Sequence, residues 1–535
     1  AIFISYFLLL RRNFGVYHAI ALMDMTWLIS LLLLFTILLL LKLIPHKNHA
    51  SSQNTHKLPP GPPKLPVIGN LHQLVGKNSL PHHRLAELAT VYGPIMHLRL
   101  GEIPTVVVSS ADVAREVMKT HDAAFCNRPS SLTVEHITYG RTDIALAPYG
   151  EYWRQVRKIA TLELLTAKRV QSFRPIREEE VTNLVESIAM EEGSVVNLSK
   201  KLFGLTFEIT SRLAFNRKGR EQEKFRALVD DITNTASGFS LCDLYPSVKN
   251  LSSITGVRRK LQDLVRRCNQ IVDPIIYDHI SKKKQGKEED CEDLVDVLLT
   301  FHRDKDEPSY DSQFSLAIDN IKAIVLQVFS AGSETSSTTL DWAMCELLKN
   351  PKIMEKAQEE VRRVLKFQDK GVVDETSLKE LKYLKGVIKE TLRLHPPLPL
   401  LLPRESMKQC KIQDYKVPTR TRIVVNACVI GRDPKRWIEP ERFSPERFEG
   451  SIVDYNGTHF ELIPFGAGRR ICPGIGLGLA NVELTLATLL YHFDWKLPDG
   501  FQPQNLSMDE TFGVVARRKQ ELLVIPSAYR QPRVN

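Results

Sequence analysis

Paired cysteines, clustered basic residues and internal repeats are all missing from this sequence. Its eight cysteines stand singly along 535 residues, with no CxxC pair, so we expect neither a disulfide framework nor a zinc site. The net charge is a modest +10, spread through helix-like segments, which suits an acidic protein partner or a membrane face and argues against nucleic acid. Disorder is not expected, because 43% of the residues are hydrophobic and 25% are charged.

Long apolar runs are also scarce, and the main one lies near the N-terminus. Residues 27–44 read WLISLLLLFTILLLLKLI, close to the ~20 apolar residues of a spanning helix. The run exceeds the usual apolar part of a signal peptide and no cleavage motif follows it, so we predict a transmembrane anchor over residues 23–45. Lysines follow the run while only Asp24 lies close before it, which predicts a cytosolic body. Residues 1–22 are expected to be an upstream translated or disordered segment.

The remainder divides into a short linker and one large domain. Residues 46–71 form the linker, whose second half, LPPGPPKLPVIGN, predicts a stiff, proline-rich hinge. Residues 72–535 form the domain. Helical periodicity dominates from 150 to 395, whereas β-like runs such as IMHLRL and TRIVVNACVI are few. We therefore predict a mainly α fold with a minor β-sheet, crossed at its centre by a helix of about 50 Å over residues 314–348.

That long helix contains an unusual segment, FSAGSETSSTTLDW. Ser and Thr side chains compete for backbone carbonyls and tend to bend or open a helix. Gly332, Glu334 and Thr335 could therefore hold a groove for water and a small ligand, with the acid and the alcohol relaying protons. The alternative is a slightly strained helix with a solvated Ser/Thr face.

Two further segments place charges beside apolar surface. Glu390 and Arg393 share one apolar helix face at i, i+3. One interpretation is that the ions lie buried and need a third partner, either Arg442 or Arg447. A weak surface pair is the alternative. In EYWRQVRK, a tryptophan and an arginine lie one turn apart, which sets a flat apolar ring beside a cation.

The stretch FGAGRRICPG surrounds one thiol with glycines and arginines. Gly466 and Gly468 allow positive φ and close approach, and Arg470 offers a fork for a carboxylate. Cys472 precedes a helical run, where the helix N-terminus and the adjacent arginine favour a thiolate. A phosphate loop is disfavoured because Ile471 replaces the last glycine and no βαβ unit surrounds the segment. A cysteine nucleophile would need a nearby histidine, which the sequence does not place.

Together these motifs, in this order and spacing, closely resemble those of the cytochrome P450 family of haem-thiolate monooxygenases. The resemblance implies that Cys472 is the axial ligand of haem b iron and that Glu334 and Thr335 deliver protons during oxygen activation. Other implied roles belong to the haem-binding residues Arg470, Arg404, Trp153, Arg157, Phe465 and Gly468, and to a structural triad of Glu390, Arg393 and Arg447.

The hinge and the helix motifs resemble the plant A-type branch, especially members that oxidise terpenoids. The resemblance implies NADPH- and O₂-dependent hydroxylation of a small lipophilic metabolite through a ferryl intermediate, on the cytosolic side of the endoplasmic reticulum membrane. Electrons would come from NADPH–cytochrome P450 reductase, which alone binds NADPH and would dock on basic residues such as Arg154, Lys158 and Arg469. The alternatives are hydroperoxide rearrangement on the same fold, a phenolic or alkaloid hydroxylase, and a binding or scaffold protein without turnover.

Substrate contacts follow from position in the family. They are expected from the segment after Cys126 and, more specifically, from Phe329, Leu400, Leu401, Phe512 and Val514. These side chains are apolar, which favours a lipophilic substrate, although each could instead pack the core.

Overall fold

The computed structural model describes most of the chain after the predicted anchor. It covers residues 57–74, 80–218, 222–236, 240–285, 292–302, 314–365, 373–511 and 513–530, with scattered positions between 27 and 36. The predicted upstream segment and most of the predicted anchor therefore lie outside the described residues. Within the described part, no helix combines the length and apolar character needed to cross a bilayer.

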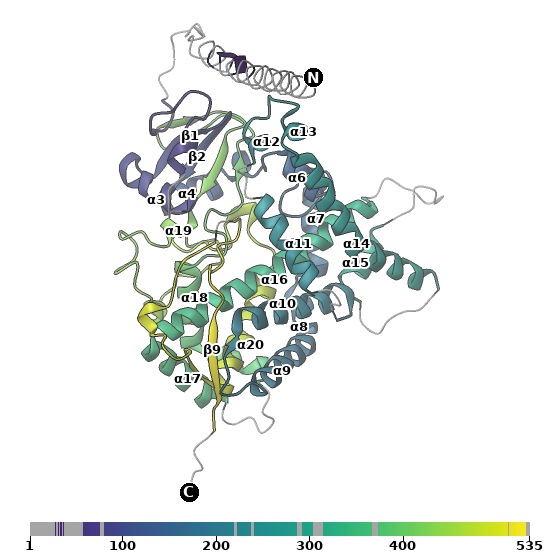
Figure 1. Cartoon of the computed structure of the whole chain (residues 1–535), viewed down its shortest axis with the longest axis vertical. Helices are drawn as coiled ribbons and strands as arrows, with labels where there is room; N and C mark the ends of the chain where they lie inside the picture. The colour runs from purple at the N-terminus through teal and green to yellow at the C-terminus, as the bar shows by residue number, and fades with distance from the viewer. Residues whose placement is uncertain are drawn as a thin grey trace, which may run out of the picture.

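Helices make up most of the described chain (Figure 1). The longer ones are α3 Pro81–Tyr92, α7 Glu151–Ile159, α9 Arg174–Ala189, α10 Leu198–Phe215, α11 Gln222–Thr235, α14 Val257–Lys284, α16 Ile318–Lys349, α17 Pro351–Leu365, α18 Lys382–Leu394 and α20 Ile475–His492. The shorter ones are α2 Leu71–Leu74, α4 Ala111–Arg115, α5 Asp122–Phe125, α6 Leu132–Ile137, α8 Ala167–Ser172, α12 Leu241–Leu244, α13 Leu251–Ile254, α15 Leu294–Thr300 and α19 Ala427–Ile430. Short 3₁₀ turns include η4 Pro445–Phe448 and η5 Gly468–Arg470.

Strands form one four-stranded sheet and two smaller ones. The strands are β1 Ile95–Leu100, β2 Ile103–Val108, β3 Val196–Asn197, β4 Arg404–Glu405, β5 Cys410–Ile412, β6 Tyr415–Val417, β7 Arg422–Val425, β8 Phe493–Lys496 and β9 Leu523–Ala528. The main sheet has the order β1-β2-β7-β4, in which β2 and β7 pair in parallel across more than 300 residues of sequence. The prediction of a mainly helical fold with a minor sheet is confirmed.

The β-like run TRIVVNACVI divides into two elements. Its first half forms β7, but the chain turns at Asn426 into helix α19. The Asn426 side chain accepts a hydrogen bond from the backbone N–H of Val429, which caps the new helix. Extended structure therefore ends earlier than the apolar pattern predicts.

Helix α16 joins the two largest cores, and Figure 1 shows it in the middle of the helical part. Its first half, from Ile321 to Phe329, packs with α10, α11 and α14. Its second half, from Leu340 to Leu348, packs with α9, α17, α18 and α20. The segment between them belongs to neither core, and the candidate site is located there.

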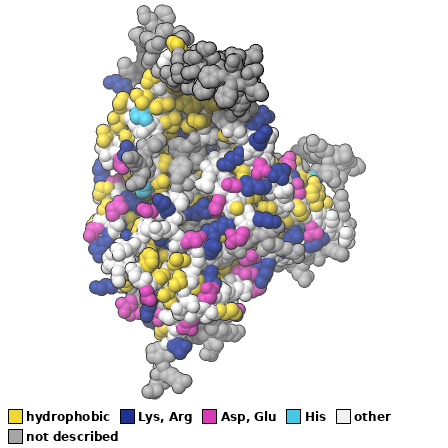
Figure 2. All heavy atoms as spheres, viewed as in Figure 1, with side chains coloured by type: hydrophobic (Ala, Val, Ile, Leu, Met, Phe, Trp, Pro, Cys, Tyr) yellow, Lys and Arg dark blue, Asp and Glu magenta, His cyan; other side chains and the backbone are white. Residues whose placement is uncertain are grey.

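Charges of both signs are interspersed on the face shown in Figure 2. No strongly basic block stands out on that face, which agrees with the low net charge of +10. This face therefore shows no concentrated positive patch of the kind that nucleic-acid binding needs.

Candidate functional site

The middle turns of α16 form one wall of a large cavity. Ala331 is exposed and Thr335 is half-buried, although most of their neighbours on the helix are buried. The helix stays continuous here, so its hydroxyl groups do not break it. Instead, Oγ1 of Thr335 donates to the Ala331 carbonyl of the preceding turn, at 2.7 Å. On another side of the helix, a Cβ added at Gly332 would lie 3.4 Å from Oγ1 of Thr210 on α10, an ordinary van der Waals contact.

The cavity has a volume of about 360 Å³ and a mostly apolar wall, within the range of small-molecule sites. Its walls come from four parts of the chain that the sequence separates widely. Besides these four, which are α16, residues 129–146, residues 398–403 and residues 513–516, the lining includes residues of the main sheet such as Thr105 and Arg422. Of the predicted substrate contacts, Leu400, Leu401 and Val514 line it.

Phe329, another predicted substrate contact, does not line this cavity. Its ring packs among Phe207, Phe215 and Phe225, with centroid distances of 5.3, 5.4 and 4.2 Å. A helix turns by about 100° per residue, and the adjacent Ser330 does line the cavity. Phe512, the remaining predicted contact, lies outside the described residues.

Glu334 is buried beside the cavity and has partners from two distant segments. Its Oε2 accepts a hydrogen bond from Oγ1 of Thr233 on α11, at 3.1 Å. Its Oε1 lies 3.4 Å from Nε of Arg517, an ion pair without hydrogen-bond geometry. Burial raises the pKa of this carboxyl to about 7, while the charge of Arg517 opposes the rise. Neither partner was identified from the sequence, because nothing in the local pattern relates them to α16.

The cysteine loop is shaped by its glycines. Gly468 has φ +72°, and a Cβ there would lie 2.1 Å from the carbonyl oxygen of Met118. The residue must therefore be glycine for two reasons, its backbone conformation and the close approach. The loop closes through a 3.0 Å hydrogen bond from the Cys472 N–H to the Phe465 carbonyl, and the ring of Phe465 packs edge-on against Tyr455.

Cys472 lies just before α20, as predicted, but its electrostatic surroundings differ from the expectation. Burial raises the pKa of the thiol, opposed by the backbone N–H of Gly474 and by the charge of Arg157. The charge of Arg470 is not among the causes of this shift. Without a bound metal, the thiolate form of Cys472 is therefore less favoured than the sequence predicts, because Arg470 makes its contacts with other groups.

Arg470 instead lies flat against Trp153, with its guanidinium carbon 4.1 Å from the ring centroid. Two of its nitrogens donate to the carbonyls of Cys126 and Ala147, at 2.9 and 2.7 Å. The third, Nη1, is buried and has no hydrogen-bond partner among the described residues. This N–H group is thus available to an acceptor that occupies the adjacent space.

Two other predicted haem donors are already engaged. The indole N–H of Trp153 donates to the Ile144 carbonyl, at 2.9 Å. Arg404 is buried and bonds Asp122 at 2.8 Å and the Ala467 carbonyl at 2.6 Å. Asp122 also pairs with Arg469 at 3.1 Å, so this acid, which the sequence did not point out, ties α5 to the cysteine loop.

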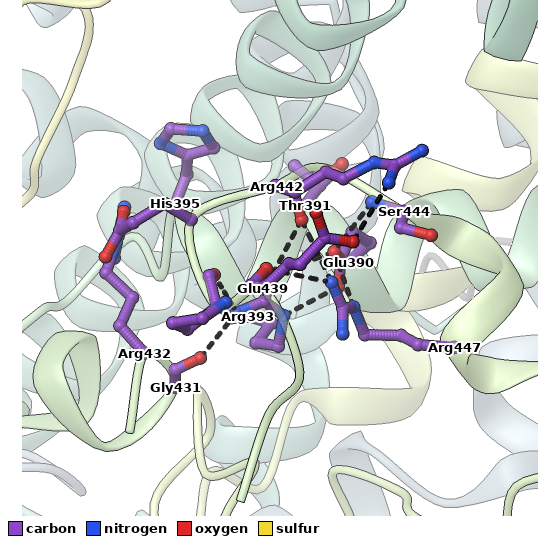
Figure 3. Close-up of polar contacts among 12 residues, drawn as sticks. Glu390, Thr391, Arg393, His395, Gly431, Arg432, Glu439, Arg442, Ser444 and Arg447 are labelled. Atoms are coloured by element: carbon purple, nitrogen blue, oxygen red, sulfur yellow. Dashed lines mark hydrogen bonds and ion pairs between the residues drawn. The ribbon is translucent and has the colours of Figure 1, made fainter. Parts of the chain in front are cut away.

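The structure brings Glu390, Arg393 and Arg447 together (Figure 3). Glu390 and Arg393 are fully buried and joined by two hydrogen bonds of 2.6 and 2.8 Å. Nε of Arg447 bonds the same carboxylate at 2.8 Å. Arg442, the other candidate, is exposed and pairs with Glu439. The backbone N–H of Ser444 gives Glu390 a further donor, so the buried carboxylate is well satisfied.

The side chains where α16 and the start of α20 approach each other have the chemistry that a haem needs. The first turns of α20 are half-exposed although they lie in the middle of the protein. Thr335, on α16, is half-exposed as well. Helices α20 and α16 approach each other at Gly478, where an added Cβ would lie 3.9 Å from Oγ of Ser336. The thiol of Cys472 suits the role of iron ligand. The unpartnered N–H of Arg470 suits a hydrogen bond to a haem propionate.

Comparisons with known proteins agree with this arrangement. The model of the family described as "Cytochrome P450" matches residues 59–524. Cytochrome P450 71D11 of Lotus japonicus is 52% identical over 91% of this chain and 98% of that protein. Tabersonine 16-hydroxylase 1 of Catharanthus roseus is 50% identical over 88% and 92%.

A third relative and one solved structure extend the comparison. Premnaspirodiene oxygenase of Hyoscyamus muticus is 48% identical over 95% of this chain and 99% of its own length. A zebra fish cytochrome P450 solved with abiraterone aligns with a TM-score of 0.70 and 27% identity, covering 85% of this chain and all of that chain. The likeness thus extends over the full described body.

Proposed function

Because this chain belongs to the cytochrome P450 family, in its plant A-type branch, and is a monooxygenase, we propose that it hydroxylates a small lipophilic terpenoid. One observation carries the proposal. Glu334 and Thr335 lie on the wall of a largely apolar cavity of about 360 Å³. An acid and an alcohol at that wall serve proton delivery, and the apolar lining suits a substrate without charge.

Haem b is held in this proposal by Cys472 as iron ligand, with Arg470 as a propionate donor. When bound, the thiolate-ligated haem supplies the oxidising chemistry that activates O₂ and inserts one oxygen atom into a C–H bond. The chain then has three tasks: to orient the substrate, to exclude excess water and to supply protons. Phe465 and Gly468 keep the cysteine loop in the shape that presents Cys472.

Proton supply falls to the two groups on α16. The Thr335 hydroxyl lies on the cavity wall, and Glu334 lies one residue earlier in a buried position. With a pKa of about 7, Glu334 exchanges protons readily near neutral pH, as a relay group should. Its hydrogen-bonded partner Thr233 and its ionic partner Arg517 hold it in place.

The relatives' names support a terpenoid substrate and leave an alternative. One relative is named as an oxygenase of premnaspirodiene and another as a hydroxylase of tabersonine. Terpenoid is the first proposal because the lining is mostly hydrocarbon; an alkaloid or phenolic substrate is the second. Rearrangement of hydroperoxides is less well supported, because it needs no proton relay and Glu334 and Thr335 lie at the cavity.

The proposal includes a partner and a location. The apolar run over residues 27–44 supports a single-pass anchor in the endoplasmic reticulum membrane, with the body in the cytosol. NADPH–cytochrome P450 reductase would supply two electrons from NADPH. Arg154 and Lys158 are exposed on α7 and half-exposed Arg469 lies near the cysteine loop, which supports docking of an acidic partner there.

The test uses microsomes that contain the full chain and the reductase. The ferrous protein should give the red-shifted carbon monoxide complex of thiolate ligation, and Cys472→Ala should abolish it. Cys410→Ala, at a half-buried free cysteine away from the loop, is the matched control and should leave the spectrum intact. Survival of the spectrum in Cys472→Ala would refute the ligand assignment. Incubation with terpenoids, alkaloids and phenolics, with product analysis, tests the substrate class; hydroxylated products from alkaloids alone would refute the terpenoid proposal.

A further inference from the structure

One end of the cavity is bounded by the main sheet and carries polar side chains. Strands β2 and β7 pair in parallel with Thr105 beside Arg422, so the two side chains lie on the same face. Both line the cavity, as do Val107 and Val424, two residues further along each strand. The sheet thus supplies a wall with an apolar part and an arginine.

Some of the polar atoms at this end are buried without partners. Thr133 is 1% exposed, and its Oγ1 has no hydrogen-bond partner among the described residues. The same holds for the buried Nε of Arg422, and burial lowers the pKa of this guanidinium. Buried polar groups are almost always hydrogen-bonded in native proteins, so two such groups on one cavity indicate a missing ligand or water.

An acid on α12 completes the cluster. Asp243 is 5% exposed and lines the cavity, and its Oδ1 accepts a long hydrogen bond of 3.4 Å from the Thr133 N–H. The charge of Asp243 acts on Arg422, as does that of Glu405. Two carboxylates already act on the arginine, so a further anion would be repelled. A neutral group that both accepts and donates a hydrogen bond fits better.

We propose that Arg422, Thr133 and Asp243 form a polar subsite that binds a hydroxyl group of the substrate. Arg422 donates to the hydroxyl oxygen, and the hydroxyl proton is donated to Asp243 or Thr133. The inference rests on the proposed function, in which this cavity holds the substrate. It specifies the substrate class as a lipophile that already carries an oxygen atom. A preceding reaction must therefore install that oxygen, by oxygenation or by hydration.

Substrate binding, rather than turnover, is the readout. Purified haem-loaded enzyme is titrated with two pairs of compounds, and the shift in haem absorption is recorded. The first pair is premnaspirodiene and its monohydroxylated counterpart, and the second is tabersonine and a hydroxylated tabersonine. The wild type should bind the more hydroxylated member of a pair about tenfold more tightly, the value of one hydrogen bond to a charged group. Arg422→Met should remove this preference and leave the affinity for the less hydroxylated member unchanged, whereas Arg422→Lys should retain part of it.

Control variants separate the outcomes. Arg420→Met changes an exposed arginine two residues away and should keep the preference. Asp243→Asn should weaken the preference and gives a second test should Arg422→Met lose its haem. Equal affinity for both members in the wild type, or a preference that survives both Arg422→Met and Asp243→Asn, overturns the subsite but leaves the proposed function standing. No shift with any of the four compounds, in protein with a normal carbon monoxide spectrum, overturns both.

Discussion

Nε of Arg517, in the C-terminal segment, lies 3.4 Å from Oε1 of Glu334 in the centre of α16. Arg517 also pairs with Asp230 on α11, at 2.6 Å. The arginine thus bridges the acid at the cavity and the helix that contributes Thr233. Because Glu334 is buried, this one charge has a large influence on whether the acid is ionised.

Arg517→Gln should raise the pKa of Glu334 above its value of about 7. The loss of a nearby opposite charge shifts a carboxyl pKa upward by about one unit or more. The pH at which product formation per NADPH changes should therefore move to higher pH by a similar amount, while Arg517→Lys should stay near the wild type. A pH profile of coupling measures this. An unshifted profile in Arg517→Gln would separate Arg517 from the relay.

The same pKa has a consequence for stability. The pKa of Glu334 is higher in the folded protein than the ordinary 4.5, so the folded state binds the proton more tightly. Folding stability from this group is present below pH 4.5 and is lost as pH rises through about 7. Glu334→Gln should flatten this part of the pH dependence in urea unfolding. A variant that keeps the wild-type slope between pH 4.5 and 7 would show that another group causes it.

Thr335→Ala should retain haem and substrate binding but waste NADPH. The hydroxyl lies on the cavity wall, and its loss interrupts proton delivery without changing the volume much. Removal of such a group costs about 10²–10⁴ in proton-transfer efficiency. Product per NADPH, measured in a reconstituted system, should therefore drop. Thr339→Ala is the matched control, since that hydroxyl makes the same bond to its own helix, at 2.8 Å, but is buried one turn away. Equal coupling in both variants would remove Thr335 from the mechanism.

Gly468→Ala should disrupt the cysteine loop. Its Cβ would lie 2.1 Å from a backbone oxygen, so the loop must shift, and the haem content of the purified protein should fall sharply. Gly450→Ala shares the positive φ, at +69° against +72°, but meets no atom within 4 Å. The control variant should therefore lose only about 1 kcal/mol of folding stability through backbone strain and should keep its haem. Similar haem loss in both variants would show that the positive φ, rather than the close approach to the backbone oxygen, makes glycine necessary.

Glu390→Gln should destabilise the folded protein by about 3–5 kcal/mol, because it leaves the buried Arg393 without its countercharge. Glu439→Gln is the control, since it breaks the exposed pair with Arg442 and should cost less than about 1 kcal/mol. Thermal unfolding of the haem-loaded protein compares the two. A Glu390→Gln midpoint equal to that of the control would mean that the buried cluster contributes little to stability.

Much of the site was predictable because its members lie close in sequence. Glu390 and Arg393 share a helix face through their i, i+3 spacing, and Gly468 shares a tight loop with Cys472. Such patterns reflect helix periodicity and glycine geometry, which act over a few residues. The side on which Phe329 lies was not predictable in this way, because adjacent helix positions diverge by about 100° and the packing of α10 and α11 decides which of them is buried.

The sequence by itself determined the family and the helical architecture, and it led to the proposal of Cys472 as iron ligand, since these follow from short motifs in a fixed order. Only the tertiary structure decided which arginine joins Glu390, which groups hold Glu334, and which polar side chains meet at the sheet end of the cavity. Arg447 rather than Arg442 bonds Glu390, and Arg517 reaches Glu334 across 183 residues. These choices depend on how distant segments pack, and electrostatic partners are selected by distance in space rather than along the chain.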